Sequence, residues 1–144
     1  MKFMLAAVAA LCLASLTTIA AGPEKLTDIG AAMTRAKTEH KLLFLQMGRE
    51  DCENCQALRA MINKKQVQLP ASQFVYADVN CDDPATMKVF RRNFKVIGST
   101  LPFVVVASPE GKQLAAKSGS GTTADFTTLI NKARQKAGVA AAKP

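Results

Sequence analysis

Short apolar runs and helix-like repeats alternate along most of this 144-residue chain. Residues 41–47 form a run that is too short and too uniformly apolar for a surface helix, which predicts a strand buried on both faces. Before it, apolar residues recur at helical spacing from Leu26 to Ala36, which predicts a helix over 27–40. The same reasoning predicts, in chain order, a helix from Cys52, a strand over 74–79, a helix from Asp82-Asp83-Pro84, strands over 101–107 and 112–117, and a helix from Thr122 or Thr123.

This order of elements is typical of an α/β fold. The first two of these strands are each followed by a helix, which favours a parallel pair in a β-α-β unit. A Ser-Pro-Glu-Gly turn over 108–111 joins the last two strands into an antiparallel hairpin. We therefore expect a central mixed four-stranded sheet flanked by helices on both faces, in one domain over residues 24–138. Residues 139–144 are expected to form a flexible tail.

The first 21 residues have the pattern of a secretory signal peptide. A positive start at Met1 and Lys2 precedes an apolar run over 3–16, and small residues follow it. We expect cleavage after Ala20 or Ala21 and export to the periplasm or the cell exterior. A retained membrane anchor is the alternative, since the stretch over 3–19 is just short of the roughly 20 residues that span a bilayer.

Composition and charge narrow the classes of partner. Apolar residues make up 49% of the chain and charged residues 21%, as in an ordinary globular domain. Removal of Lys2 with the signal would lower the net charge from +8 to +7, which favours acidic partners non-specifically. The basic residues are scattered, so we expect no nucleic-acid partner, and we expect no stable membrane insertion after cleavage. A monomer is favoured, and no cofactor is expected.

Two cysteines, Cys52 and Cys55, lie where the predicted buried strand turns into a helix. At a helix N-terminus, free backbone N–H groups and the positive end of the dipole stabilise a thiolate. Cys52 is therefore the candidate nucleophile. Cys55 lies one turn later, close enough to attack a mixed disulfide at Cys52 and release the product, so it is the candidate resolving thiol.

With this pair in this order of elements, residues 29–136 resemble the thioredoxin superfamily, and in particular its exported thioredoxin-like domains. Cys52 and Cys55 match the redox pair of the family. Pro102 matches the proline that, in the family, follows a cis peptide bond and faces that pair. The resemblance implies a thioredoxin-like fold, thiol-disulfide exchange with protein substrates and an unidentified redox partner, and contact of Leu101 and Pro102 with the substrate.

The chain departs from the family pattern around the cysteines. Gln46 stands where thioredoxins have a buried acid, and a neutral amide cannot act as a base. Glu53 and Asn54 replace the family's Gly-Pro between the cysteines, and Asp51 precedes them. The two carboxylates oppose thiolate formation and should make the pair more reducing, unless Asp51 only caps the helix. The approach to the proline over 98–102 is also about two residues longer than in the family, which would alter the substrate groove.

Cys81 is the third cysteine that the mature chain would keep, and this odd number suggests one bridge and one spare thiol. It ends the second predicted strand, at the sheet edge where Cys52 begins its helix, so it is a possible third thiol or a buried structural cysteine.

Three interpretations of the cysteines are open. The leading hypothesis is an exported thiol-disulfide oxidoreductase. The first alternative is a redox-inactive binding scaffold with a structural Cys52–Cys55 bridge. The second is a metal site on Cys52, Cys55 and Cys81, for which the sequence offers no fourth ligand, so no metal is expected.

Overall fold

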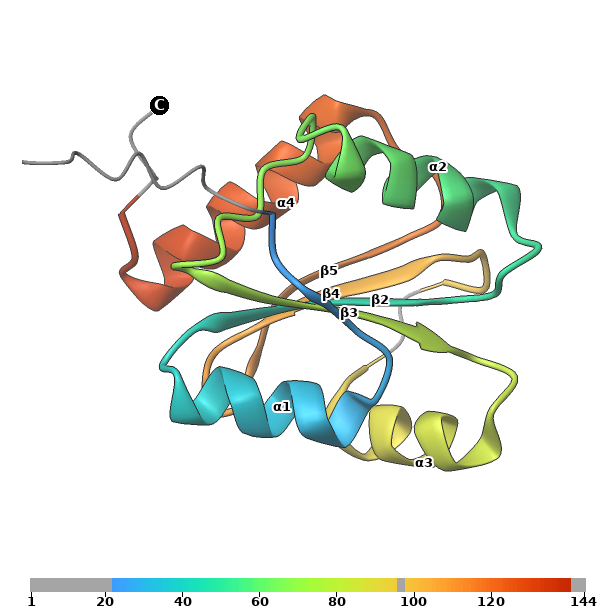
Figure 1. The fold of residues 1–144 in the computed structure, drawn as a ribbon, viewed down its shortest axis with the longest axis horizontal. Helices are drawn as coiled ribbons and strands as arrows, with labels where there is room; N and C mark the ends of the chain where they lie inside the picture. The colour runs from blue at the N-terminus through green and yellow to red at the C-terminus, as the bar shows by residue number, and fades with distance from the viewer. Residues whose placement is uncertain (1–21, 96–97, 141–144) are drawn as a thin grey trace, which may run out of the picture.

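The computed structural model describes residues 22–95 and 98–140, which form one five-stranded sheet between two pairs of helices (Figure 1). The predicted signal peptide and residues 141–144 of the predicted tail lie outside the described residues. The strands are β1 (Lys25–Leu26), β2 (Leu42–Gly48), β3 (Phe74–Asn80), β4 (Phe103–Ala107) and β5 (Gln113–Ser118). The helices are α1 (Ile29–Thr38), α2 (Glu53–Asn63), α3 (Pro84–Asn93) and α4 (Thr123–Ala137).

The sheet has the strand order β1-β3-β2-β4-β5. β1 and β2 both pair with β3 in parallel, whereas β4 pairs antiparallel with β2 and with β5. The predicted β-α-β unit and the predicted hairpin are therefore confirmed. The carboxyl ends of β2 and β3 meet at one edge of the sheet, where Gly48 is in register with Asn80.

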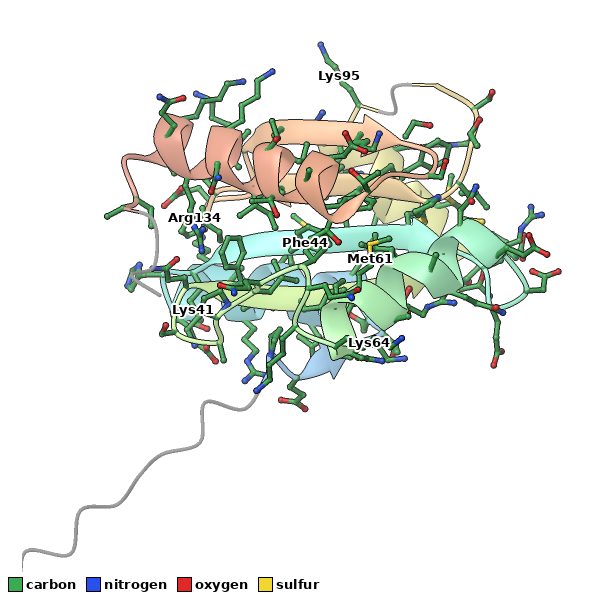
Figure 2. All side chains as sticks on the ribbon, turned by 90° about the horizontal axis from the view of Figure 1, so that it is seen from above. Lys41, Phe44, Met61, Lys64, Lys95 and Arg134 are labelled. Atoms are coloured by element: carbon green, nitrogen blue, oxygen red, sulfur yellow. A yellow bond between two sulfur atoms is a disulfide. The ribbon has the colours of Figure 1, made fainter. Side chains whose placement is uncertain are left out.

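Two hydrophobic clusters fill the space between the sheet and its helices. On one face, Phe44 and Tyr76 pack with Leu58 of α2 and Phe126 of α4, and Met61 lies against this cluster (Figure 2). On the other face, buried residues of the same strands pack with α1 and α3, through Ala32 and Phe90 among others. Helices thus cover both faces of the sheet, as the continuous apolar runs of the central strands predict.

The sheet has five strands, so the prediction of four was wrong. Lys25 and Leu26 form the short edge strand β1, and α1 begins only at Ile29. Leu26, which the helical spacing placed on the helix, still packs against the α1–α3 cluster. A two-residue strand has no alternation to detect, and its position depends on backbone pairing with Tyr76 and Ala77 of β3.

The helix starts agree with the capping chemistry of the sequence. Asp83 caps α3 through the backbone N–H groups of Ala85 and Thr86, and Pro84 opens that helix. Thr122 and Asp125 form a reciprocal capping box at the start of α4. Within residues 22–95 and 98–140, none of the helices combines the length and hydropathy of a membrane span.

Candidate functional site

A disulfide joins Cys52 and Cys55 at the start of α2. Cys52 is the N-cap residue, and its Sγ accepts a hydrogen bond from the Cys55 backbone N–H at 3.2 Å. Cys52 is partly exposed, whereas Cys55 is fully buried. An incoming sulfur can therefore reach Cys52 first, while Cys55 is shielded beneath it.

A buried proline lies beside the pair. The Leu101–Pro102 peptide bond is cis, and Leu101 is partly exposed. Asn54, between the two cysteines, donates from Nδ2 to the Leu101 carbonyl oxygen at 3.4 Å. The cysteine helix and the loop before β4, which are 47 residues apart in the chain, are thus joined at the site.

Gln46 of β2 is fully buried under the cysteine helix. Its Nε2 donates to the Cys55 carbonyl oxygen at 3.1 Å, and its Oε1 accepts from the Tyr76 hydroxyl at 3.2 Å. Burial, together with the nearby Asp78 carboxylate, raises the pKa of Tyr76 well above its ordinary value, so the phenol stays protonated and remains a donor. Gln46 therefore serves as a neutral link between β3 and the cysteine helix.

A second polar group on the same face anchors the loop that leads to Cys52. Arg59 of α2 donates from Nε to Asp78 Oδ2 at 2.6 Å and from Nη2 to the Arg49 carbonyl oxygen at 3.0 Å. The hydrogen bond to Asp78 raises the pKa of Arg59, which stays charged. Asp78 also lies 3.9 Å from Lys25 Nζ. The pair thus connects α2, β3 and the β2–α2 loop.

The carboxylates around Cys52 are exposed. Asp51 precedes the helix and Glu53 lies in its first turn. The N-cap of α2 is Cys52 itself, so the alternative that Asp51 caps the helix is wrong. Asp51 and Glu53 thus flank Cys52 in the chain, and a carboxylate close to a thiolate opposes its formation.

The Cys81 side chain packs on the other face of the sheet from α2, although its backbone N–H donates to the Gly48 carbonyl oxygen at 2.9 Å. It follows β3 and packs against the α1–α3 cluster, whereas Cys55 belongs to the helix on the opposite face. Its Sγ lies 4.0 Å from Asp82 Oδ1, and contacts with Cys81 and Asp82 raise the pKa of Arg49. Within the described residues, no three His, Cys, Asp or Glu side chains are arranged to hold a metal ion.

Solved structures that are similar to this one include thioredoxins. A thioredoxin from Thermus thermophilus is similar at 22% identity and a TM-score of 0.55, over 80% of this chain and 87% of that chain. The short form of spinach chloroplast thioredoxin f has 14% identity and a TM-score of 0.58, over 80% and 96%. A third match, in a complex of ferredoxin:thioredoxin reductase with thioredoxin f2, has 16% identity and a TM-score of 0.58, over 81% and 99%.

The chain has the thioredoxin fold. Comparison of the sequence itself found no matching family model and no matching curated protein. The thioredoxin-like architecture therefore persists here at very low sequence identity, with the Cys-x-x-Cys pair in place at the start of α2.

Four contributors to the site, Gly48, Tyr76, Arg59 and Asp78, were missing from the sequence-based set. Gly48 lies against Cys55, Tyr76 contacts Gln46, and Arg59 binds Asp78. Asp78 carried a usable signal, since a lone carboxylate in the otherwise apolar run over 74–79 calls for a buried partner. The identity of that partner depends on tertiary packing.

Proposed function

We propose that this protein is an exported thiol-disulfide oxidoreductase that exchanges disulfides with protein substrates through Cys52 and Cys55. One observation carries the proposal: a partly exposed Cys52 at a helix N-terminus is bonded to a buried Cys55. The helix N-terminus favours the thiolate that attacks, and the neighbouring cysteine completes the exchange. Export rests on the signal-like pattern of residues 1–21.

The exchange has two balanced steps. In the reduced protein, the Cys52 thiolate attacks one sulfur of a substrate disulfide, and the other substrate sulfur leaves as a thiolate. The Cys55 thiolate then attacks Cys52 Sγ, which releases the second substrate thiolate and forms the Cys52–Cys55 bond. Two electrons pass from the cysteine pair to the substrate. With a substrate dithiol and the oxidised pair, the same steps run in reverse.

The proposed partners are of two kinds. Protein thiols or disulfides are the substrates, with the partly exposed Leu101, next to the buried Pro102, supplying the contact surface beside Cys52. A redox partner restores the starting form of the cysteine pair. The similarity to a thioredoxin f2 structure that contains a reductase supports this second class of partner.

The test is the equilibrium reduction potential in glutathione and dithiothreitol buffers, with alkylation and mass spectrometry scoring each cysteine separately. We expect a reversible Cys52–Cys55 couple between about −270 and −120 mV, the range of thioredoxin-fold redox catalysts. Cys52→Ser should abolish dithiol-dependent disulfide reduction, and Cys55→Ser should trap mixed disulfides. Cys81→Ser is the matched control and should retain activity.

The buried amide of Gln46 favours one competing function. A redox-inactive scaffold would need no base under the pair, and its Cys52–Cys55 bridge would serve only stability. A couple below about −300 mV that resists dithiols would support the scaffold. Turnover by the Cys52→Ser variant would exclude the oxidoreductase mechanism.

A further inference from the structure

Gln46 holds the main chain of Cys55 at a fixed point of the sheet. Gln46 and Cys55 are both fully buried, so water does not compete for the 3.1 Å hydrogen bond from Gln46 Nε2 to the Cys55 carbonyl oxygen. The residue two positions along β2, Gly48, lies on the same face and contacts the Cys55 side chain. β2 thus supports Cys55 through both its backbone and its sulfur.

The Cys55 carbonyl sets which way the Gln46 amide points, and Tyr76 holds the other end of the amide. The Cys55 carbonyl can only accept, so the amide nitrogen must face it. The protonated Tyr76 hydroxyl donates to Oε1 from the neighbouring strand at 3.2 Å, which occupies the other end of the amide. A rotated amide would place its own oxygen against the carbonyl oxygen, acceptor against acceptor, and would lose the hydrogen bond to Cys55. Gln46 is therefore held in one orientation.

The two steps of the exchange make unequal demands on this contact. Attack by Cys52 uses a partly exposed sulfur at the helix cap, whereas the Gln46 amide is hydrogen-bonded to Cys55 and Tyr76. Resolution requires buried Cys55 Sγ to approach Cys52 Sγ in line with the mixed disulfide. A misplacement of about 1 Å in such a reaction can cost about 100-fold in rate. The resolving step is thus the one that depends on where the Cys55 backbone is held.

We propose that Gln46, held by Tyr76, is a positioning residue for the resolving step, acting through its hydrogen bond to the Cys55 carbonyl. The inference rests on the proposed oxidoreductase function and adds a residue to it. It makes the buried amide an active part of the site, with no proton transfer through Gln46. Tyr76 has its effect only through Gln46.

The experiment follows single turnovers of the reduced protein with 2-hydroxyethyl disulfide. Samples are quenched with acid, and mass spectrometry measures the reduced, mixed-disulfide and Cys52–Cys55 forms over time. Gln46→Leu should slow the resolving step about 10- to 100-fold and make the mixed disulfide accumulate, while the attack rate changes less than about twofold. Gln56→Leu is the matched control, because Gln56 lies on α2 but donates to the Glu50 carbonyl oxygen.

A second variant keeps the test decisive if Gln46→Leu folds poorly. Tyr76→Phe removes only the hydroxyl and should slow resolution in the same direction by a smaller factor. The double variant should resolve no more slowly than Gln46→Leu alone, because both changes act through one contact.

Two results would overturn the inference. One is resolution at the wild-type rate in both single variants. The other is an equal slowing of attack and resolution, which would indicate a general loosening of the fold around the cysteine pair. Failure of the wild-type protein to form either a mixed disulfide or a Cys52–Cys55 bond would overturn the oxidoreductase function itself, and the inference with it.

Discussion

Gly48 of β2 lies directly against the sulfur of Cys55. A Cβ built on Gly48 would come within 2.5 Å of Cys55 Sγ and within 3.2 Å of Cys55 Cβ. Both residues are buried, so neither can move aside into solvent. The absence of a side chain at Gly48 therefore makes room for the resolving thiol.

A methyl group at this point should destabilise the oxidised protein. We expect Gly48→Ala to lower the free energy of unfolding by about 1–3 kcal/mol, because a well-packed site must shift to admit it. Urea denaturation with the disulfide intact measures the change. Gly22→Ala is the control, since a Cβ there meets nothing within 4 Å. Equal stabilities of the two variants would contradict this account of the packing.

The Arg59–Asp78 pair should contribute more to stability than the neighbouring Arg49–Asp82 pair. The Asp78 side chain is 5% exposed, whereas that of Asp82 is 54% exposed. Asp78→Ala would leave Arg59 without its buried partner, so we expect a loss of about 3 kcal/mol. Asp82→Ala, the matched control, should cost less than about 1 kcal/mol. Chemical denaturation of both variants measures the loss in free energy of unfolding. Similar losses in the two variants would contradict this prediction.

The polar residues of the site explain how far the sequence could predict it. The Cys52–Cys55 spacing and the start of α2 are local features, so the pair and its helix followed directly from the pattern. The contact between Gln46 and Tyr76 joins strands 30 residues apart and depends on their register. The sequence marked Gln46 as a departure from the family but contained no local signal for its partners.

The edge strand β1 shows the same limit on what the sequence alone can predict. β2, β3 and β4 carry long apolar runs and were predicted close to their observed bounds. β1 has two residues, and the backbone of β3 decides where it lies. Periodicity therefore predicted the core elements, whereas the register and the edge strand required the assembled sheet.

The carboxylates beside Cys52 should set the redox potential. Asp51 and Glu53 are exposed near the cap, where negative charge destabilises a thiolate and so disfavours the reduced form. Asp51→Asn with Glu53→Gln should make the potential less negative by about 10–30 mV. Equilibration with glutathione measures it, and the difference should shrink at high salt.

Glu110→Gln is the control for removing an exposed carboxylate away from the cysteine pair. Glu110 lies in the turn between β4 and β5, and the antiparallel register places that turn at the opposite end of β2 from Gly48. Its removal should leave the potential unchanged. A double variant at Asp51 and Glu53 with the wild-type potential would show that these charges are fully screened.

The carboxylates at the starts of α3 and α4 should make the stability of the fold sensitive to acid. Hydrogen bonds from the Thr86 hydroxyl and the Thr86 and Ala85 amides lower the pKa of Asp83. Bonds from the Thr122 amide and hydroxyl lower the pKa of Asp125. A carboxyl group whose pKa is lowered in the folded state stabilises the fold at pH values above its ordinary pKa of about 3.9. This contribution is lost as the pH falls through the folded-state pKa.

Asp83→Asn with Asp125→Asn should therefore weaken the pH dependence of stability. Asparagine is a good N-cap at position 83, and at position 125 its side-chain oxygen can still accept from the Thr122 N–H, so the fold should be retained at neutral pH. We expect the Tm of the double variant to fall less than that of the wild type between about pH 5 and pH 2. Thermal unfolding across that range tests it. Parallel curves for the two proteins would rule out a role of these carboxylates in acid unfolding.

The brevity of β1 also bears on self-association. β1 covers β3 only at Tyr76 and Ala77, beside a strand whose side chains are apolar except at Asp78 and Asn80. An uncovered apolar strand offers unpaired N–H and C=O groups to other chains. A short edge strand that carries a lysine reduces such pairing between chains. Lys25, held near Asp78, places a positive charge on this edge strand and so disfavours intermolecular strand pairing. Loss of β1 would expose an aggregation-prone edge without removing any residue of the cysteine site.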